Sequence, residues 1–122
     1  MSIRIDIRQA WIKYQVYAPT LESENELELR GESYLVRIFL HSEDIAVIQQ
    51  VQKVVYRFGP DFPYRIIESS NWRTNFDCKI FSSRRFEFEF EIYLRNNFLP
   101  YTGRYNVDIF SPDPKGFPVP LG

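Results

Sequence analysis

The chain has 122 residues, of which 44% are hydrophobic and 25% charged, a composition typical of a single soluble domain that buries its own core. Its formal net charge of −1 excludes general binding to nucleic acid or to an anionic membrane, because both require a positive field. No apolar run approaches the roughly 20 residues that cross a bilayer, so we expect no membrane contact in this segment.

Alternation of apolar and polar residues predicts several short strands in the first third of the chain. Successive side chains of a strand face opposite sides, so a period of two marks a half-buried strand. Ile3, Ile5 and Ile7 alternate with charged residues, and Pro19 and Gly31 mark breaks further on. The predicted strands in this part span residues 3–7, 10–17, 21–30 and 34–40.

A short helix and a strand are predicted next. Ser42 or Asp44 can accept hydrogen bonds from the free N–H groups at the start of a helix over residues 45–48. The helix must be brief, because β-branched and aromatic residues from Val51 onward predict a strand. Gly59 and the proline after it end that strand.

The second half of the chain continues the pattern. Ser82-Ser83 is expected to join two strands, and Tyr101-Thr102-Gly103 is expected to form a turn. Residues 63–71 are expected to lead from the preceding strand into a loop. The predicted strands span residues 75–81, 85–94 and 105–110.

Residues 111–122 contain four prolines and are expected to form an extended linker or a disordered end. The folded domain is therefore predicted to span residues 1–110. Short strands separated by turns are typical of an all-β sandwich, here with about seven or eight antiparallel strands and at most one short helix.

The sequence contains no recognisable catalytic constellation. His41 is the only histidine and Cys78 the only cysteine, and no pattern in the sequence brings the two together. Glu87, Glu89 and Glu91 share one face of a predicted strand, which we interpret as a solvated face opposite basic residues, because one straight strand cannot surround a cation. We therefore expect no enzymatic activity, no metal and no cofactor.

Several aromatic residues are candidates for a binding slot at one end of the sandwich. Phe62 is held on a turn between Asp61 and Pro63. It can line such a slot together with Trp72, Phe86 and Tyr64. The alternative is that Phe62 and Phe86 close the end of the core. Trp72 lies in a polar stretch, where it either caps a sheet edge or is exposed as a contact residue.

Four arginines fall in predicted loops at or near the same end: Arg65, Arg73, Arg84 and Arg85. Guanidinium groups bind carboxylates and phosphates in bidentate fashion, so an acidic peptide or a phosphorylated ligand is one candidate partner. The alternative is that these arginines are surface charges paired with acidic residues.

The segment Phe58-Gly59-Pro60-Asp61-Phe62-Pro63 resembles the signature loop of the YEATS domains, hydrophobic-His-x-[Ser/Thr]-Phe-Pro. Residues 34–39, 42–50 and 86–94 resemble neighbouring family segments, so the likeness covers roughly residues 33 to 110. The resemblance is nearer to the bacterial branch of the family. It implies an immunoglobulin-like sandwich that binds a peptide partner, with acylated lysine held between aromatic side chains.

Two loops depart from the family pattern. Gly59 stands at the position of the family histidine and Asp61 at that of the serine or threonine. The second loop, Ser82 to Phe86, lacks the family's aromatic residue and both of its glycines. Phe62 and Phe86 remain as aromatic residues of the family pattern.

The sequence thus predicts a non-catalytic recognition module of a bacterial signalling or stress-response protein. Because Cys78 is the only cysteine, no intrachain disulfide can form. The charged N-terminus does not resemble a signal peptide, and both features lead us to expect a cytoplasmic location. The alternative is an assembly domain without a pocket, acting through a sheet edge or the Trp72 loop. The predicted ligand-binding residues are Gly59, Asp61, Phe62, Tyr64, Trp72, Ser83, Arg84 and Phe86.

An open cleft between Phe62 and Phe86 would favour the recognition module. A filled site with a flat apolar patch elsewhere would favour the assembly domain.

Overall fold

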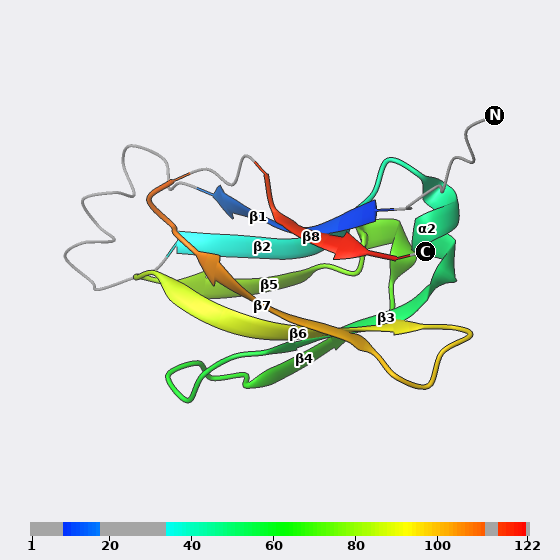
Figure 1. Cartoon of the computed structure of the whole chain (residues 1–122). Helices are drawn as coiled ribbons and strands as arrows, with labels where there is room; N and C mark the ends of the chain where they lie inside the picture. Colours follow the sequence, from blue (N-terminus) through cyan, green and yellow to red (C-terminus); the bar gives the residue numbers. More distant parts are fainter. Residues whose placement is uncertain (1–8, 18–33, 112–114, 122) are drawn as a thin grey trace.

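The computed structural model describes residues 9–17, 34–111 and 115–121. Within these residues two antiparallel sheets pack face to face, in the strand orders β5-β2-β1-β8 and β4-β3-β6-β7 (Figure 1). The predicted strands at residues 3–7 and 21–30 lie outside the described residues. The strands are β1 (Gln9–Tyr17), β2 (Tyr34–His41), β3 (Val51–Arg57), β4 (Ile66–Ser69), β5 (Cys78–Ser82), β6 (Phe86–Leu94), β7 (Tyr101–Val107) and β8 (Phe117–Pro120). This confirms the all-β sandwich.

The core lies between the two sheets, and β6 shows how alternation builds it. Phe88 and Phe90 are buried between the sheets, whereas the glutamates between and beside them face outward. On the outer face, Arg104 pairs with Glu89 at 2.7 Å and Arg57 pairs with Glu91 at 3.0 Å. The glutamate row is therefore a solvated face with basic partners, as interpreted from the sequence.

One short helix, α2 (Ile45–Gln50), connects β2 to β3. The Asp44 carboxylate caps it by accepting a hydrogen bond from the Ala46 N–H at 2.9 Å. Val47 and Ile48 are buried and attach the helix to the end of the sandwich. The predicted helix and its cap are confirmed. A single turn of 3₁₀ helix, η1 (Trp72–Thr74), connects β4 to β5.

The turn predicted at residues 101–103 is wrong, because β7 runs through all three of them. Gly103 pairs with Phe90 of β6, and the Phe90 ring occupies the space that a side chain at Gly103 would need. The glycine serves close packing between neighbouring strands and does not mark a turn.

The prediction of a linker or disordered end is wrong for the last described residues. Residues 117–120 form β8, which pairs with β1. Val119 and Leu121 are buried in the core. Pro118 and Pro120 fit because β8 is at the edge of its sheet among the described strands, where a missing N–H breaks no second ladder.

The short strand β4 was not predicted either. Its four residues lie in the stretch that was expected to lead into a loop, and they pair with β3 from Val54↔Ser69 to Arg57↔Ile66. Four residues give too short an alternation for the sequence to identify a strand.

Candidate functional site

Two loops meet at one end of the sandwich, on the left of Figure 1. The 58–65 loop connects β3 to β4, and the 83–85 loop connects β5 to β6. The Phe58 N–H donates to the Arg65 carbonyl at 2.7 Å and closes the base of the longer loop. The Phe62 N–H donates to the Gly59 carbonyl at 3.2 Å, so the Gly-Pro-Asp segment forms a tight turn that presents Phe62.

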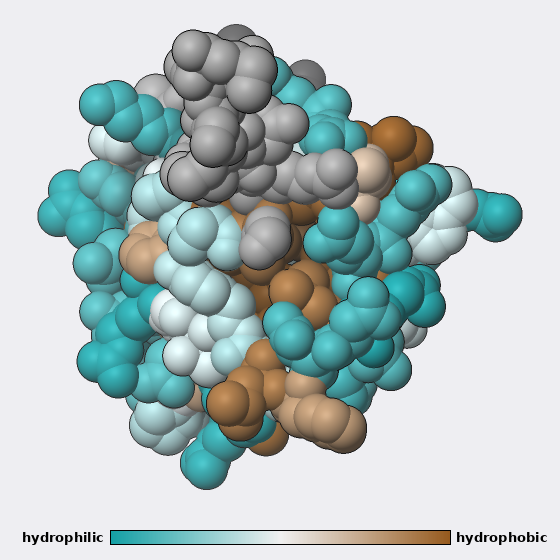
Figure 2. Space-filling model, turned by 45° about the vertical axis from the view of Figure 1, so that its right-hand side comes forward, coloured by the Kyte–Doolittle hydropathy of each residue, from teal (hydrophilic) through white to brown (hydrophobic). Residues whose placement is uncertain are grey.

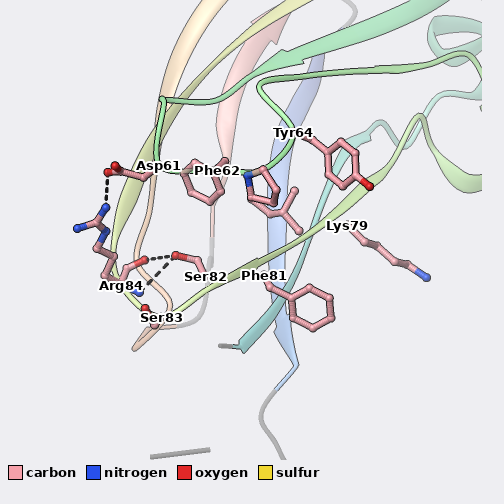
Figure 3. Close-up of a pocket in the computed structure, with 10 residues that line it drawn as sticks. Asp61, Phe62, Tyr64, Lys79, Phe81, Ser82, Ser83 and Arg84 are labelled. Carbon is pink, nitrogen blue, oxygen red and sulfur yellow. Dashed lines mark hydrogen bonds and ion pairs between the residues drawn. The ribbon is translucent and has the colours of Figure 1, made fainter. Parts of the chain in front are cut away.

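A groove of about 550 Å³ lies between the 58–65 loop and β5 (Figure 3). Ile80 is buried at its base, and Phe62 is half-buried beside it. Tyr64 and Phe81 are 70% and 65% exposed, which leaves two aromatic side chains at the rim open to a ligand. The groove is lined by Asp61, Phe62, Pro63, Tyr64, Lys79, Ile80, Phe81, Ser82, Ser83 and Arg84.

Phe62 and Phe86 do not form two walls of a slot. Their ring centroids are 5.0 Å apart at an interplanar angle of 66°, so the two rings touch edge to face. Phe58 packs against Phe62 at 5.4 Å and completes the cluster. A flat amide has no room between rings in direct contact. The alternative in which Phe62 and Phe86 close the end of the core is the one that the structure contains. The open cleft between Phe62 and Phe86 that would favour the recognition module is therefore not there, and the groove lies between the 58–65 loop and β5 instead.

An ion pair between Asp61 and Arg84 joins the two loops at one end of the groove (Figure 3). Ser82 holds the backbone of Arg84 in place, since its hydroxyl donates to the Arg84 carbonyl at 2.7 Å and accepts from the Arg84 N–H at 3.3 Å. Both charged side chains remain about two-thirds exposed, at 70% for Asp61 and 67% for Arg84. The pair therefore lies in solvent and contributes little to stability.

Arg85 and Arg73, which were also predicted near this end, lie apart from each other. Arg85 pairs with Asp108 at 3.1 Å and lies over the Phe110 ring. The Phe110 N–H, together with the Arg85 guanidinium, lowers the pKa of the Asp108 carboxyl. Arg73 lies in η1 over the Trp72 ring at 5.5 Å. The prediction that all four arginines gather at one end is wrong for Arg73.

Trp72 lies at the end of the sandwich opposite the groove. β4 runs from the 58–65 loop toward η1, and β5 returns from η1 toward the 83–85 loop. Trp72 is 48% exposed there, so it belongs to an exposed turn and not to the groove. The prediction that Trp72 shares the site is wrong.

Of the predicted site residues, the structure brings Asp61, Phe62, Tyr64, Ser83 and Arg84 together around the groove. Gly59 and Phe86 lie beside it and do not line it.

Lys79 and Phe81 line the groove and were missed by the sequence analysis. The sequence did contain a sign of their position. Both residues alternate with buried Cys78 and Ile80, so their side chains face outward on β5.

Cys78 and His41 do not form a reaction centre together. Burial raises the pKa of the Cys78 thiol far above its usual range, so the thiol is a poor nucleophile. The His41 ring lies near the Trp11 ring, at 6.2 Å, and not near Cys78. Within the described ranges no group of three or more His, Cys, Asp or Glu residues could hold a metal ion. No helix in the described part of the chain is long and apolar enough to cross a membrane.

No family model and no curated protein matches the sequence. Solved structures of yeast Yaf9 resemble the fold. The Yaf9 YEATS domain bound to H3K27ac has a TM-score of 0.63 at 16% identity, covering 87% of this chain and 78% of that chain. The yeast AF-9 homolog protein Yaf9 has a TM-score of 0.61 at 15% identity, covering 84% and 67% respectively.

A third structure, the Yaf9 YEATS domain recognizing an H3K122suc peptide, has a TM-score of 0.53 at 14% identity and covers 88% of this chain and 91% of that chain. At sequence identities this low, the similarity shows the fold alone. The chain has a YEATS-like, immunoglobulin-like sandwich fold.

Proposed function

We propose that the protein is a non-catalytic recognition module that binds a peptide in the groove between the 58–65 loop and β5. The observation that carries the proposal is the groove itself, with Phe62 at its base and Tyr64 and Phe81 exposed at its rim. Concave apolar surfaces with a few polar groups are the usual form of ligand sites. Asp61, Ser83 and Arg84 supply the polar contacts.

An acylated lysine is the specific ligand that we propose for this groove. Two of the similar Yaf9 structures are described as bound to H3K27ac and recognizing H3K122suc. A flat, neutral amide stacks well on aromatic faces. In this chain Tyr64 and Phe81 would take the place of the aromatic residue missing from the second loop, while Phe62 supports the base.

Binding of lysine peptides in unmodified, acetylated and crotonylated form tests the proposal. Phe62→Ala removes the base of the groove but also disturbs the cluster with Phe58 and Phe86. Phe81→Ser therefore serves as the main variant, because this side chain is exposed and can be changed without opening the core. Phe98→Ser makes the same exchange at an exposed position between β6 and β7, at the other end of β6 from the groove.

We expect binding that requires the acyl group and is lost in Phe81→Ser but kept in Phe98→Ser. Equal binding of modified and unmodified peptides would remove the acyl-lysine proposal. No binding of any peptide at millimolar concentration would remove the recognition function.

We further propose that the chain stands near the bacterial branch of the YEATS domains and acts in the cytoplasm within a signalling or stress-response system. Gly59 and Asp61 depart from the loop pattern of the nuclear readers, which supports a place outside that branch. Proximity labelling in the native cell, followed by identification of the labelled proteins, tests this. Labelling of chromatin proteins in place of signalling components would contradict it.

A second candidate is an assembly domain that acts away from the groove. Figure 2 shows hydrophobic residues running down the middle of one face of the molecule, between hydrophilic ones. At the end opposite the groove, Trp72 is 48% exposed, and Phe98 and Leu99 are exposed almost completely. Light scattering over a range of concentrations tests this candidate. A mass that grows with concentration and falls in Trp72→Ser would favour it, and a constant monomer mass would remove it.

A further inference from the structure

The two segments that border the groove, residues 58–65 and 79–86, are basic, although the chain as a whole has a net charge of −1. Residues 58–65 and 79–86 contain four basic residues and one acidic residue. The acid is Asp61, and the bases are Arg65, Lys79, Arg84 and Arg85. A ligand that enters the groove therefore meets a positive local field.

The four bases differ in how far they are neutralised. Arg84 pairs with Asp61 and Arg85 with Asp108. Lys79 is exposed on β5, lines the groove, and makes no ion pair with any described residue. A lysine that faces a binding groove without a carboxylate partner is suited to receive one from a ligand.

Lys79 and Arg84 lie at opposite ends of the groove, with the apolar side chains of Phe62, Tyr64 and Phe81 between them (Figure 3). The Asp61–Arg84 pair is exposed, so exchanging Asp61 for a ligand carboxylate costs little. The groove thus presents an apolar centre with a cation at each end.

We propose that the partner of this groove is an extended acidic peptide. Its central apolar or acylated side chain enters between Tyr64 and Phe81, and its flanking carboxylates pair with Lys79 and Arg84. This inference rests on the proposed recognition function. It adds that the ligand residues on either side of the central side chain are acidic. A basic flanking sequence is disfavoured, since like charges at an interface repel.

Fluorescence anisotropy with matched short peptides tests the inference. Each peptide carries the same central residue (acetyl-lysine, crotonyl-lysine or leucine) flanked by glutamates, glutamines or lysines. We expect the glutamate-flanked peptides to bind about threefold to tenfold more tightly than the glutamine-flanked ones at low salt, as befits one or two exposed ion pairs. The difference shrinks as salt is added.

Lys79→Glu is the deciding variant, and it should abolish or reverse the preference for acidic flanks. Arg73→Glu makes the same charge change on η1, at the end opposite the groove, and should leave the preference intact. Binding without any preference among the flanks would overturn the acidic partner and leave the recognition function standing. Tighter binding of lysine-flanked peptides would also overturn it. Absence of binding by every peptide would remove the recognition function, and this inference with it.

Discussion

Phe62 serves the core and the groove at the same time. One part of its ring packs against Phe58 and Phe86, and another part forms the base of the groove. From the sequence these roles were alternatives, because a pattern of residue types does not tell which surface of a ring is covered. The rim residues Tyr64 and Phe81 belong to the groove alone, since both are exposed and neither fills the core. Substitutions there test binding without disturbing the core.

The hydroxyl of Tyr56 makes a hydrogen bond inside the core. Tyr56 is fully buried, and its hydroxyl donates to the carbonyl of Phe76 at 2.5 Å. Phe76 has a positive φ of 53°, so this hydrogen bond supports a backbone conformation that is rare for a bulky residue. Tyr56→Phe should lower the free energy of unfolding by about 1–3 kcal/mol, because a buried carbonyl loses its partner. Urea denaturation measures this, and Tyr64→Phe, with an exposed hydroxyl, should change almost nothing.

Burial raises the pKa of both the Cys78 thiol and the Tyr56 phenol. Both groups stay protonated in the folded protein at pH values where they ionise in the unfolded chain, roughly 8.5 for a thiol and 10 for a phenol. The stability that the two neutral groups give to the folded protein is fully present below these pH values. The free energy of unfolding falls as the pH rises through them. Urea midpoints between pH 7 and 11 should show this fall, with a smaller fall in Cys78→Ala.

A thiol reagent gives an independent check on Cys78. The native protein should react slowly at pH 8, and the urea-unfolded protein should react at the rate of a free cysteine. Rapid labelling of the native protein would contradict the buried position.

At the scale of the element, the β6–β7 pair shows why a glycine can be required inside a strand. Gly103 faces the Phe90 ring, and a side chain there would collide with it. Gly103→Ala should therefore destabilise the protein by about 1–3 kcal/mol through overpacking. Thermal unfolding measures the effect, with Thr102→Ala on the exposed side of the same strand as the control. Equal melting temperatures for the two variants would show that the Phe90 ring moves aside freely.

The sequence was sufficient for the strands with strict alternation, and β6 is the clearest example. It was not sufficient for β4, which has only four residues, or for β8, whose two prolines suggested a linker. An edge position makes prolines tolerable, but edge positions follow from the assembled sheet and not from local sequence. The same limit applies to Lys79 and Phe81, which become site residues only because the 58–65 loop lies beside β5.

At the scale of the whole molecule, a YEATS-like sandwich carries a groove whose side chains differ from the family pattern. Gly59 stands where the family has a histidine, and a side chain built at Gly59 meets open space. Gly59→His should therefore leave the melting temperature nearly unchanged. If the groove binds acyl-lysine, the added imidazole should strengthen binding by offering a hydrogen bond. Calorimetric titration with a crotonylated peptide checks this, and an unchanged affinity would place the ligand away from Gly59.

The most direct test of the groove as the binding site is a two-dimensional ¹H–¹⁵N NMR titration with a crotonyl-lysine peptide flanked by glutamates. We expect shifted amide signals to concentrate in residues 61, 62, 64 and 79–84, and the signals of η1 to stay in place. Shifts concentrated around Trp72, or no shifts at millimolar peptide, would contradict the assignment of the groove as a peptide-binding site.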